Sequence, residues 1–279
     1  MILRSIGQVM LQRNAMSGAL MLVGIAIGSW QAALMALTGC LIGNITALLC
    51  KYDKSEINDG LYGFNGTLVG IAAWVFLSHS IAMLAIIIVA AALSTIIAHL
   101  FIKRRWSGYT APFVIATWLM IVVTMIFPSL KFETTTSTEE TAEWLKALSL
   151  HYGQVMLEEQ SLWTGIFLLL AVAINDWRAA LYSLWGATLP LLSPLLTHDI
   201  AAFNAGLYGY NAVLCAIALS EHKPSNFLWV TLAIFLSTLL QWAGISISIT
   251  TLTAPFVITT WIVIALRTKI QNKDTTLNT

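Results

Sequence analysis

Polar side chains suited to hydrogen-bonding a neutral solute occur as matched pairs in this otherwise apolar chain. The pairs are Gln8 with Gln154, Asn65 with Asn211, and Thr110 with Thr253. A polar group inside an apolar span is costly unless it is hydrogen-bonded, so the recurring amides and hydroxyls indicate a path for water or a polar solute. The other interpretation is structural, with each glutamine or threonine capping a helix end. We expect the asparagines to satisfy free backbone N–H groups where the chain enters the helix that contains them.

Two aromatic–aliphatic pairs have the spacing of residues on one helical face. Phe64 precedes Leu68 by four residues, and Tyr210 precedes Leu214 by four, so each pair lies on one side of a helix at its start. Such a pair is ordinarily core packing. Because glycines flank both pairs and thin the backbone beside them, each pair also fits a flat apolar slot.

Charged side chains are missing from the middle of every expected span. Glu158 and Glu159 come closest, directly after a short helix and near its mouth. A central charge usually marks ion coupling or a proton relay. The chain also lacks a Walker loop, an H-E-x-x-H motif and a G-x-S-x-G motif, so we expect neither an enzyme nor a metal or cofactor site. A path lined by amides, hydroxyls and apolar slots suits a small neutral polar molecule.

The composition indicates the element type that must position these residues. Of 279 residues, 58% are hydrophobic and only 10% are charged, whereas a soluble domain carries about a quarter charged residues. At about 25 residues per span and turn, the length allows about ten bilayer crossings. The net charge of +1 gives no reason to expect nucleic acid as a partner. The fold class is therefore an all-α polytopic membrane protein.

An internal repeat divides the chain into two halves of about 140 residues. Three motifs of the first half recur in order in the second, 146, 146 and 143 positions later: Gly7–Leu11 at Gly153–Leu157, Gly60–Asn65 at Gly206–Asn211, and Thr110–Ile115 at Thr253–Ile258. We assign residues 1–130 to the first repeat, 131–143 to an extracytoplasmic linker and 144–279 to the second repeat. Such duplication is typical of membrane transporters with a substrate site between the repeats.

Each repeat is predicted to contain five transmembrane helices and one short re-entrant helix. The first has apolar runs at 16–30, 32–49, 61–77, 81–102 and 111–127, after a short run at 2–11. The second has runs at 161–174, 179–196, 206–220, 227–243 and 254–266, after a short helix at 144–157. The short runs do not span about 30 Å of hydrocarbon. Because five is odd, the second repeat must be inverted relative to the first.

The basic residues support this topology because they prefer the cytoplasmic side. With both termini in the cytoplasm, twelve basic residues lie inside, and only Lys131 and Lys146 lie outside. An even number of spans per half would scatter the charges over both faces.

The duplicated motifs resemble the urea transporter (urea channel) family, in its bacterial type, over almost the whole chain. The similarity lies in the doubled Gly-x-x-Gly-[Phe/Tyr]-Asn, the doubled Thr-Ala-Pro-Phe and the Gly-Gln-Val openings. The resemblance implies passive, channel-like transport of urea, a homotrimer with one pore per subunit, and a bacterial inner membrane. It also implies that both aromatic–leucine pairs sandwich urea, that Gln8 and Gln154 hydrogen-bond it, and that Thr110 and Thr253 form the constricted middle site.

Two departures from the family pattern stand out. Trp106-Ser107 and Ile249-Thr250 occupy the places of a common Leu-Pro, and Tyr210 adds a hydroxyl where phenylalanine is expected. Alternative functions are a channel for water, ammonia or small amides, and an ion-coupled urea transporter if Glu158 or Glu159 reaches the pore. A membrane scaffold or an enzyme would leave the paired glutamines and threonines unexplained.

Overall fold

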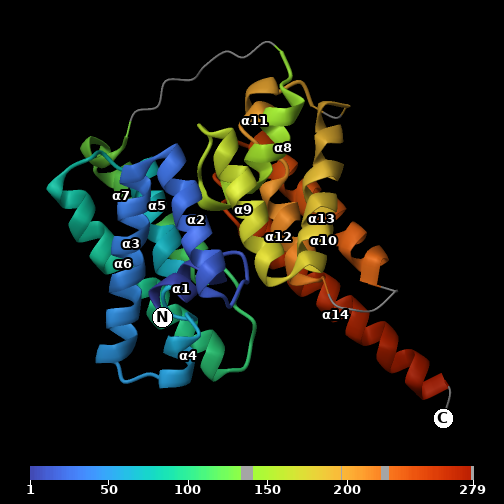
Figure 1. Ribbon diagram of the computed structural model, residues 1–279, viewed down its shortest axis with the longest axis horizontal. Helices are drawn as coiled ribbons and strands as arrows, with labels where there is room; N and C mark the ends of the chain where they lie inside the picture. The colour runs from blue at the N-terminus through green and yellow to red at the C-terminus, as the bar shows by residue number, and fades with distance from the viewer. Residues whose placement is uncertain (133–140, 196, 221–225, 278–279) are drawn as a thin grey trace.

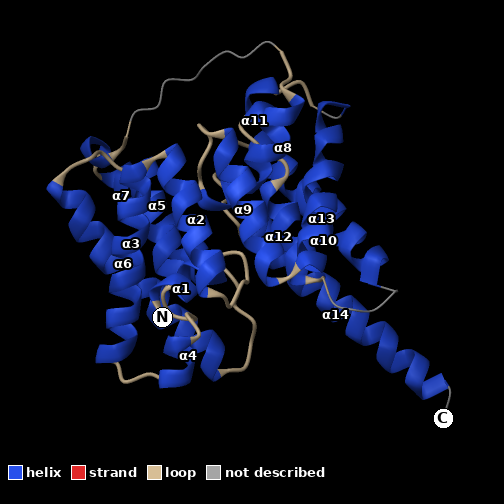
Figure 2. Cartoon of the chain, in the orientation of Figure 1, coloured by secondary structure: helices blue, strands red, loops and turns tan. Residues whose placement is uncertain are grey.

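The computed structural model describes the backbone of residues 1–132, 141–195, 197–220 and 226–277. Every regular element in these ranges is helical (Figure 2). Most of the expected linker, at 133–140, and Lys223 among the basic residues lie outside the described part, as does the side chain of Lys273.

Most helices overlap the predicted apolar runs, with three differences. The run predicted at 179–196 is divided into an α-helix, Trp177–Thr188, and a 3-10 helix, Leu189–Leu195, and the last helix, Ala254–Leu277, extends beyond residue 266. The short helices Lys54–Asn58 and Ile200–Asn204 were not predicted. The first half contains α1 (Ile2–Gln8), α2 (Ala15–Gly28), α3 (Trp30–Leu49), α4 (Lys54–Asn58), α5 (Phe64–Phe76), α6 (Ile81–Lys103), α7 (Ala111–Ile126) and the short 3-10 helix η1 (Pro128–Leu130). The second contains α8 (Trp144–Gly153), η2 (Gln154–Met156), α9 (Leu162–Asn175), α10 (Trp177–Thr188), η3 (Leu189–Leu195), α11 (Ile200–Asn204), α12 (Tyr210–Ala218), α13 (Asn226–Ser246) and α14 (Ala254–Leu277).

Side-chain caps set several helix starts. Asn14 accepts from the backbone N–H groups of Met16 and Ser17 at the start of α2, and Asp176 accepts from the first turn of α10. In both cases the cap satisfies donors that have no partner within the helix. α7 begins with a proline in its first turn, where the missing N–H costs nothing.

Three helices in the described part are long and apolar enough to cross a membrane, judged by length and composition. They are α3, α6 and α13, and four shorter apolar helices, α2, α5, α7 and α9, have 10–17 residues. A helix of 14 residues, such as α2, extends only about 21 Å at 1.5 Å per residue, less than the hydrocarbon core. The chain thus has the apolar helices of a membrane protein, while the count of ten spans stays a prediction.

The two halves lie side by side, with α1–α7 on one side of the molecule and α8–α14 on the other (Figure 1). They meet where α2 packs against α9. The Thr164 hydroxyl donates to the Gly24 carbonyl at 2.8 Å, and the Asn175 amide donates to Gln12 Oε1 at 2.9 Å. The beginning of each helix therefore lies beside the end of the other, so the two helices run antiparallel.

A second connection between the halves is reciprocal. The Trp118 indole donates to the Thr250 carbonyl at 2.8 Å, and the Trp261 indole donates to the Ser107 carbonyl at 2.8 Å. Trp261 lies 143 positions after Trp118, and Thr250 lies 143 positions after Ser107, so the two bonds join equivalent positions of the two halves. The bonds hold the segments before α7 and α14 at the two places where the sequence lacks the Leu-Pro of the family pattern.

Candidate functional site

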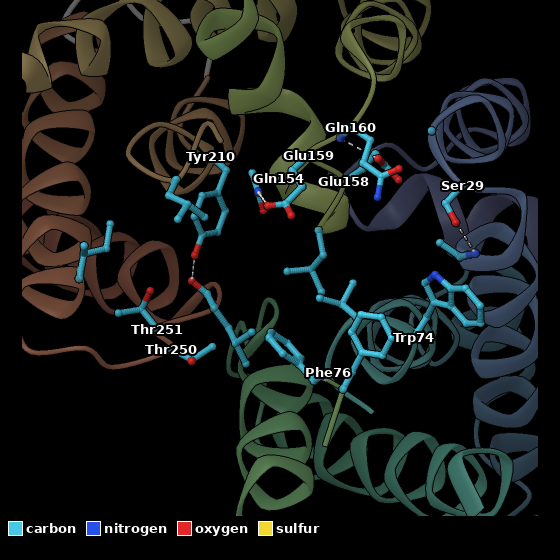
Figure 3. Close-up of a pocket in the computed structure, with 18 of the residues that line it drawn as sticks. Ser29, Trp74, Phe76, Gln154, Glu158, Glu159, Gln160, Tyr210, Thr250 and Thr251 are labelled. Atoms are coloured by element: carbon cyan, nitrogen blue, oxygen red, sulfur yellow. Dashed lines mark hydrogen bonds between the residues drawn. The ribbon is translucent and has the colours of Figure 1, made fainter. Parts of the chain in front are cut away.

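A pocket of about 850 Å³ lies between the two halves. Figure 3 shows aromatic side chains of the first half, Trp74 and Phe76, across from Tyr210, Thr250 and Thr251 of the second, with Gln154, Glu158 and Glu159 at a third side. The lining therefore combines flat apolar surfaces with carboxylate, amide and hydroxyl groups. Such a surface can hold a small molecule that has both hydrogen-bond donors and acceptors.

The two predicted glutamines have different surroundings. Gln154, in η2, is 5% exposed, lines the pocket, and donates to Glu159 Oε2 at 3.4 Å. Gln8, at the end of α1, donates to the Asp59 carbonyl at 3.0 Å, and Asp59 is the C-cap of α4. Gln8 thus hydrogen-bonds the end of a neighbouring helix, as the structural interpretation of the glutamines expects. It is not among the residues that line this pocket.

Both carboxylates that follow the short second helix line the pocket. Glu158 lies in the turn between η2 and α9, is buried, and accepts from the Gln160 backbone N–H at 3.0 Å. Burial raises the pKa of Glu158 above its ordinary value, because a carboxylate loses hydration there. Glu159 is exposed. This mouth of the candidate path therefore carries charge, unlike the interior of the expected spans.

The first residues of α5 and α12 are the two predicted aromatic side chains. Phe64 and Leu68 are buried and do not line the pocket, whereas Tyr210 does, with Leu214 fully buried behind the first turn of α12. The Tyr210 hydroxyl donates to the Leu252 carbonyl at 2.5 Å. Because the hydroxyl of Tyr210 is hydrogen-bonded to the backbone, the polar group that distinguishes it from phenylalanine is satisfied within the protein. The ring itself remains an apolar surface.

The asparagines next to these aromatics cap a different helix from the one expected. Asn65 Oδ1 accepts from the Phe113 N–H at 3.1 Å, and Asn211 Oδ1 accepts from the Phe256 N–H at 3.0 Å. Each asparagine thus satisfies the first turn of α7 or α14 rather than its own helix. The expectation of a structural role agrees with these contacts, but the assigned helix was wrong because the cap comes from a distant part of the chain.

The paired threonines meet directly. Thr253 Oγ1 donates to Thr110 Oγ1 at 2.7 Å, and the residues are 3% and 1% exposed. Thr110 occupies the N-cap position of α7, yet its side chain makes no cap bond. The hydroxyls therefore contact each other, across the two halves, instead of satisfying the helices that follow them.

Gln241 is a polar residue that the comparison of the two halves did not identify. It lies in α13, lines the pocket, and accepts hydrogen bonds from Asn211 and Thr251. Because its position 146 residues earlier is Thr95 and not glutamine, a search for duplicated residues passes over it. The available signal was a lone amide within an apolar run, which is costly unless partnered.

Metal ligation finds no support in the described residues, which contain no group of three or more His, Cys, Asp or Glu side chains able to hold an ion.

Comparisons with known proteins agree in pointing to one family. A family model described as "Urea transporter" matches residues 1–268. Urea transporter 1 of Rattus norvegicus is 31% identical over 237 residues, and that of Mus musculus is 30% identical over 241 residues; each match covers 78% of this chain and 62% of the relative. Urea transporter 1 of Ovis aries is 28% identical over 303 residues, covering 97% of this chain and 77% of the relative. The matches thus reach only about 62% of the rat and mouse proteins.

Proposed function

Because this chain belongs to the urea transporter family, we propose that it conducts urea passively across a membrane, through a narrow path between its two halves. The family is one of transporters, so no enzymatic activity is assigned. The observation that carries the proposal is the meeting of Thr110 and Thr253, one from each half, at 2.7 Å in the buried centre. Two hydroxyls that meet without a fixed charge suit a neutral solute better than an ion.

Urea is planar, with one carbonyl acceptor and four N–H donors, and the proposed path offers partners for both. Gln154 and the carboxylates line the pocket at its mouth. From there urea passes between Tyr210 and Leu214, crosses the threonine pair, and passes between Phe64 and Leu68 toward Gln8. Flat apolar faces in the two slots fit the faces of the molecule, and polar groups along the path replace water at its edge.

The architecture that we propose is the inverted repeat, with residues 1–130 and 144–279 as the two units and 131–143 as the linker. Each unit contributes five spans and one re-entrant helix, α1 or α8. Support comes from the antiparallel packing of α2 on α9 and from the reciprocal tryptophan bonds, which join equivalent positions. Inverted units of this kind place the substrate site at their interface.

Assembly and location are likewise proposals. By resemblance to the family, the protein forms a homotrimer with one pore per subunit in a bacterial inner membrane, with both termini in the cytoplasm. Many large apolar side chains are exposed on the single chain, such as Trp30, Ile81 and Met125. An apolar exterior fits both lipid and subunit contacts.

A second candidate function is ion-coupled urea transport, because Glu158 and Glu159 line the pocket. A carboxylate with a raised pKa can exchange a proton, which is a known element of coupled transport. Conduction of water, ammonia or small amides through the same slots is the remaining alternative.

Stopped-flow urea flux into proteoliposomes separates these functions. Passive conduction predicts flux well above that of empty vesicles, unchanged by a proton or sodium gradient. Accumulation of urea only when a gradient is present would favour coupling instead, and flux no faster than in empty vesicles would contradict urea transport altogether. Competition by acetamide or thiourea, measured in the same vesicles, reports how closely the path discriminates among small amides.

A further inference from the structure

Gln241 is a buried amide beside the hydroxyl group of Tyr210, which lies 3.3 Å from Gln241 Oε1. It lies near the C-terminal end of α13, is 3% exposed and lines the pocket. Its hydrogen bonds join α13 to the segment that precedes α14 and to the start of α12. Both neighbouring segments carry residues of the proposed path.

The orientation of this amide follows from a chain of hydrogen bonds. The backbone N–H of Phe256 can only donate, so the Asn211 atom that it contacts at 3.0 Å is the acceptor Oδ1. The other Asn211 atom is therefore the donor Nδ2, which contacts Gln241 at 3.0 Å. The Gln241 atom at that contact must then be the acceptor Oε1, which also accepts from the Thr251 hydroxyl at 2.6 Å.

Oε1 of Gln241 is occupied by hydrogen bonds from the protein, so the Nε2 group is the part of the amide that is left to bind a solute. Within the described part of the chain, no residue accepts a hydrogen bond from it. Two N–H donors on a residue that is almost fully buried are costly unless something satisfies them. Since Gln241 lines the pocket, its donors are available to the molecule that occupies the pocket.

We propose that Gln241 is a specificity-determining residue whose Nε2 group donates to the carbonyl oxygen of urea or of a small amide in the pocket. This inference rests on the proposed function. Oε1 is fixed by Asn211 and Thr251, so Nε2 is oriented before the solute arrives, which reduces the entropy lost on binding. Carboxylates of Glu158 and Glu159 line the same pocket and accept N–H groups.

The first half offers no matching donor. Thr95 lies 146 positions before Gln241, and its hydroxyl donates to the Tyr62 and Ala91 carbonyls at 3.1 Å. A donor equivalent to Gln241 Nε2 for the carbonyl oxygen of urea is therefore present in the second half alone.

The test compares urea with thiourea, which differ in the one atom that Gln241 would contact. Sulfur is a weak acceptor, so loss of the donor should reduce the preference for urea. Gln241→Met keeps the length of the side chain and removes its hydrogen-bonding groups. Thr238→Val is the matched control, because this residue lies one turn earlier in α13, donates to the Ile234 carbonyl of its own helix at 2.9 Å and does not line the pocket. The ratio of urea to thiourea flux is measured in proteoliposomes, with water flux as a check on the open path.

The expected result is a fall of about 3- to 10-fold in the urea-to-thiourea ratio for Gln241→Met, which corresponds to one neutral hydrogen bond, with a ratio near wild type for Thr238→Val. An unchanged ratio in Gln241→Met, with urea flux intact in the wild type, would overturn the inference and leave the proposed function standing. No urea flux in the wild type would reject the proposed function itself. If Gln241→Met does not fold, the wild type decides: preference for urea over thiourea supports the inference, and equal conduction overturns it.

Discussion

Thr110 and Thr253 have one hydroxyl proton each, and the hydrogen bond between them uses only one of these two protons. Thr253 donates to Thr110, so the Thr110 proton is left for a passing solute, and both oxygens retain acceptor capacity. A pair of this kind can exchange partners without a charge being desolvated, which keeps the barrier for a neutral molecule low and that for an ion high. This is the chemical role that the centre of the proposed path requires.

Replacement of both threonines by valine should therefore reduce urea flux strongly while the protein still assembles. Thr110→Val with Thr253→Val keeps the side-chain shape and leaves an apolar constriction, where urea loses hydrogen bonds worth about 1 kcal/mol each. We expect a fall in flux of about 10-fold or more, measured by stopped flow in vesicles of equal protein content. Flux at the wild-type rate, with normal elution in size-exclusion chromatography, would place the constriction elsewhere.

Glu158 provides a pH-dependent stability prediction. Burial raises its pKa in the folded state, whereas in the unfolded chain the pKa lies near the ordinary value of about 4.3. The folded state therefore binds this proton more tightly, so the contribution of Glu158 to stability is greatest at low pH and is lost as the pH rises through the folded pKa. Glu158→Gln removes this decline and keeps an oxygen for the Gln160 N–H.

Thermal unfolding in detergent between pH 4 and pH 8 measures the effect. The Glu158→Gln variant should unfold at a higher temperature than the wild type at pH 8, and the difference should shrink as the pH is lowered. Glu159→Gln is the control, since it changes an exposed carboxylate in the same turn. A difference that grows toward low pH would contradict the assigned effect of burial.

At the scale of elements, α3 and α5 are joined by close backbone contact. A methyl group added at Gly66 would overlap the Gly39 carbonyl, and one added at Gly39 would overlap the Gly66 carbonyl. Small residues let helices approach closely where lipid supplies no hydrophobic driving force between them. This contact fixes α5, and with it the position of Phe64 at the N-terminus of that helix.

Gly66→Ala should accordingly destabilise the protein by about 3 kcal/mol or prevent its accumulation in the membrane, because a backbone carbonyl cannot move aside. The equivalent position in α12 already carries Ala212, so Ala212→Gly serves as the matched control and should cost only about 1 kcal/mol. Unfolding in detergent and expression level report both variants. Equal effects of the two substitutions would contradict the close backbone contact between α3 and α5 at Gly39 and Gly66.

Sequence periodicity was enough to predict most helices. The run at 81–102 corresponds to α6 (Ile81–Lys103), and the run at 111–127 to α7 (Ala111–Ile126), because long apolar runs with polar ends determine helices locally. The helix that each asparagine caps was not predictable, since Asn65 reaches Phe113 through a long-range contact. The orientation of Gln241 likewise depends on three segments that only the folded chain brings together.

At the scale of the whole molecule, the repeat predicted which residues meet between the halves but not how the mouth is built. Thr110 and Thr253 were expected to come together, and their hydroxyl groups are in contact. The pocket, by contrast, combines Trp74 and Phe76 with Glu158 and Tyr210, and most of these positions are not duplicated. A search for symmetry identifies residues that meet between the halves and passes over the parts of the pocket that differ between them.

The orientation of the whole chain in the membrane can be tested with a native thiol. Cys40 and Cys215 are buried, whereas Cys50 is exposed at the end of α3, beside Lys51 in a segment expected on the cytoplasmic side. A membrane-impermeant maleimide should therefore label Cys50 in inside-out vesicles and not in right-side-out vesicles, and Cys50→Ser should abolish the signal. Lys131→Cys in the Cys50→Ser background should show the opposite pattern, because Lys131 is expected outside and is exposed. Labelling of both positions from the same side would contradict an odd number of crossings between them, and with it the inversion of the second half.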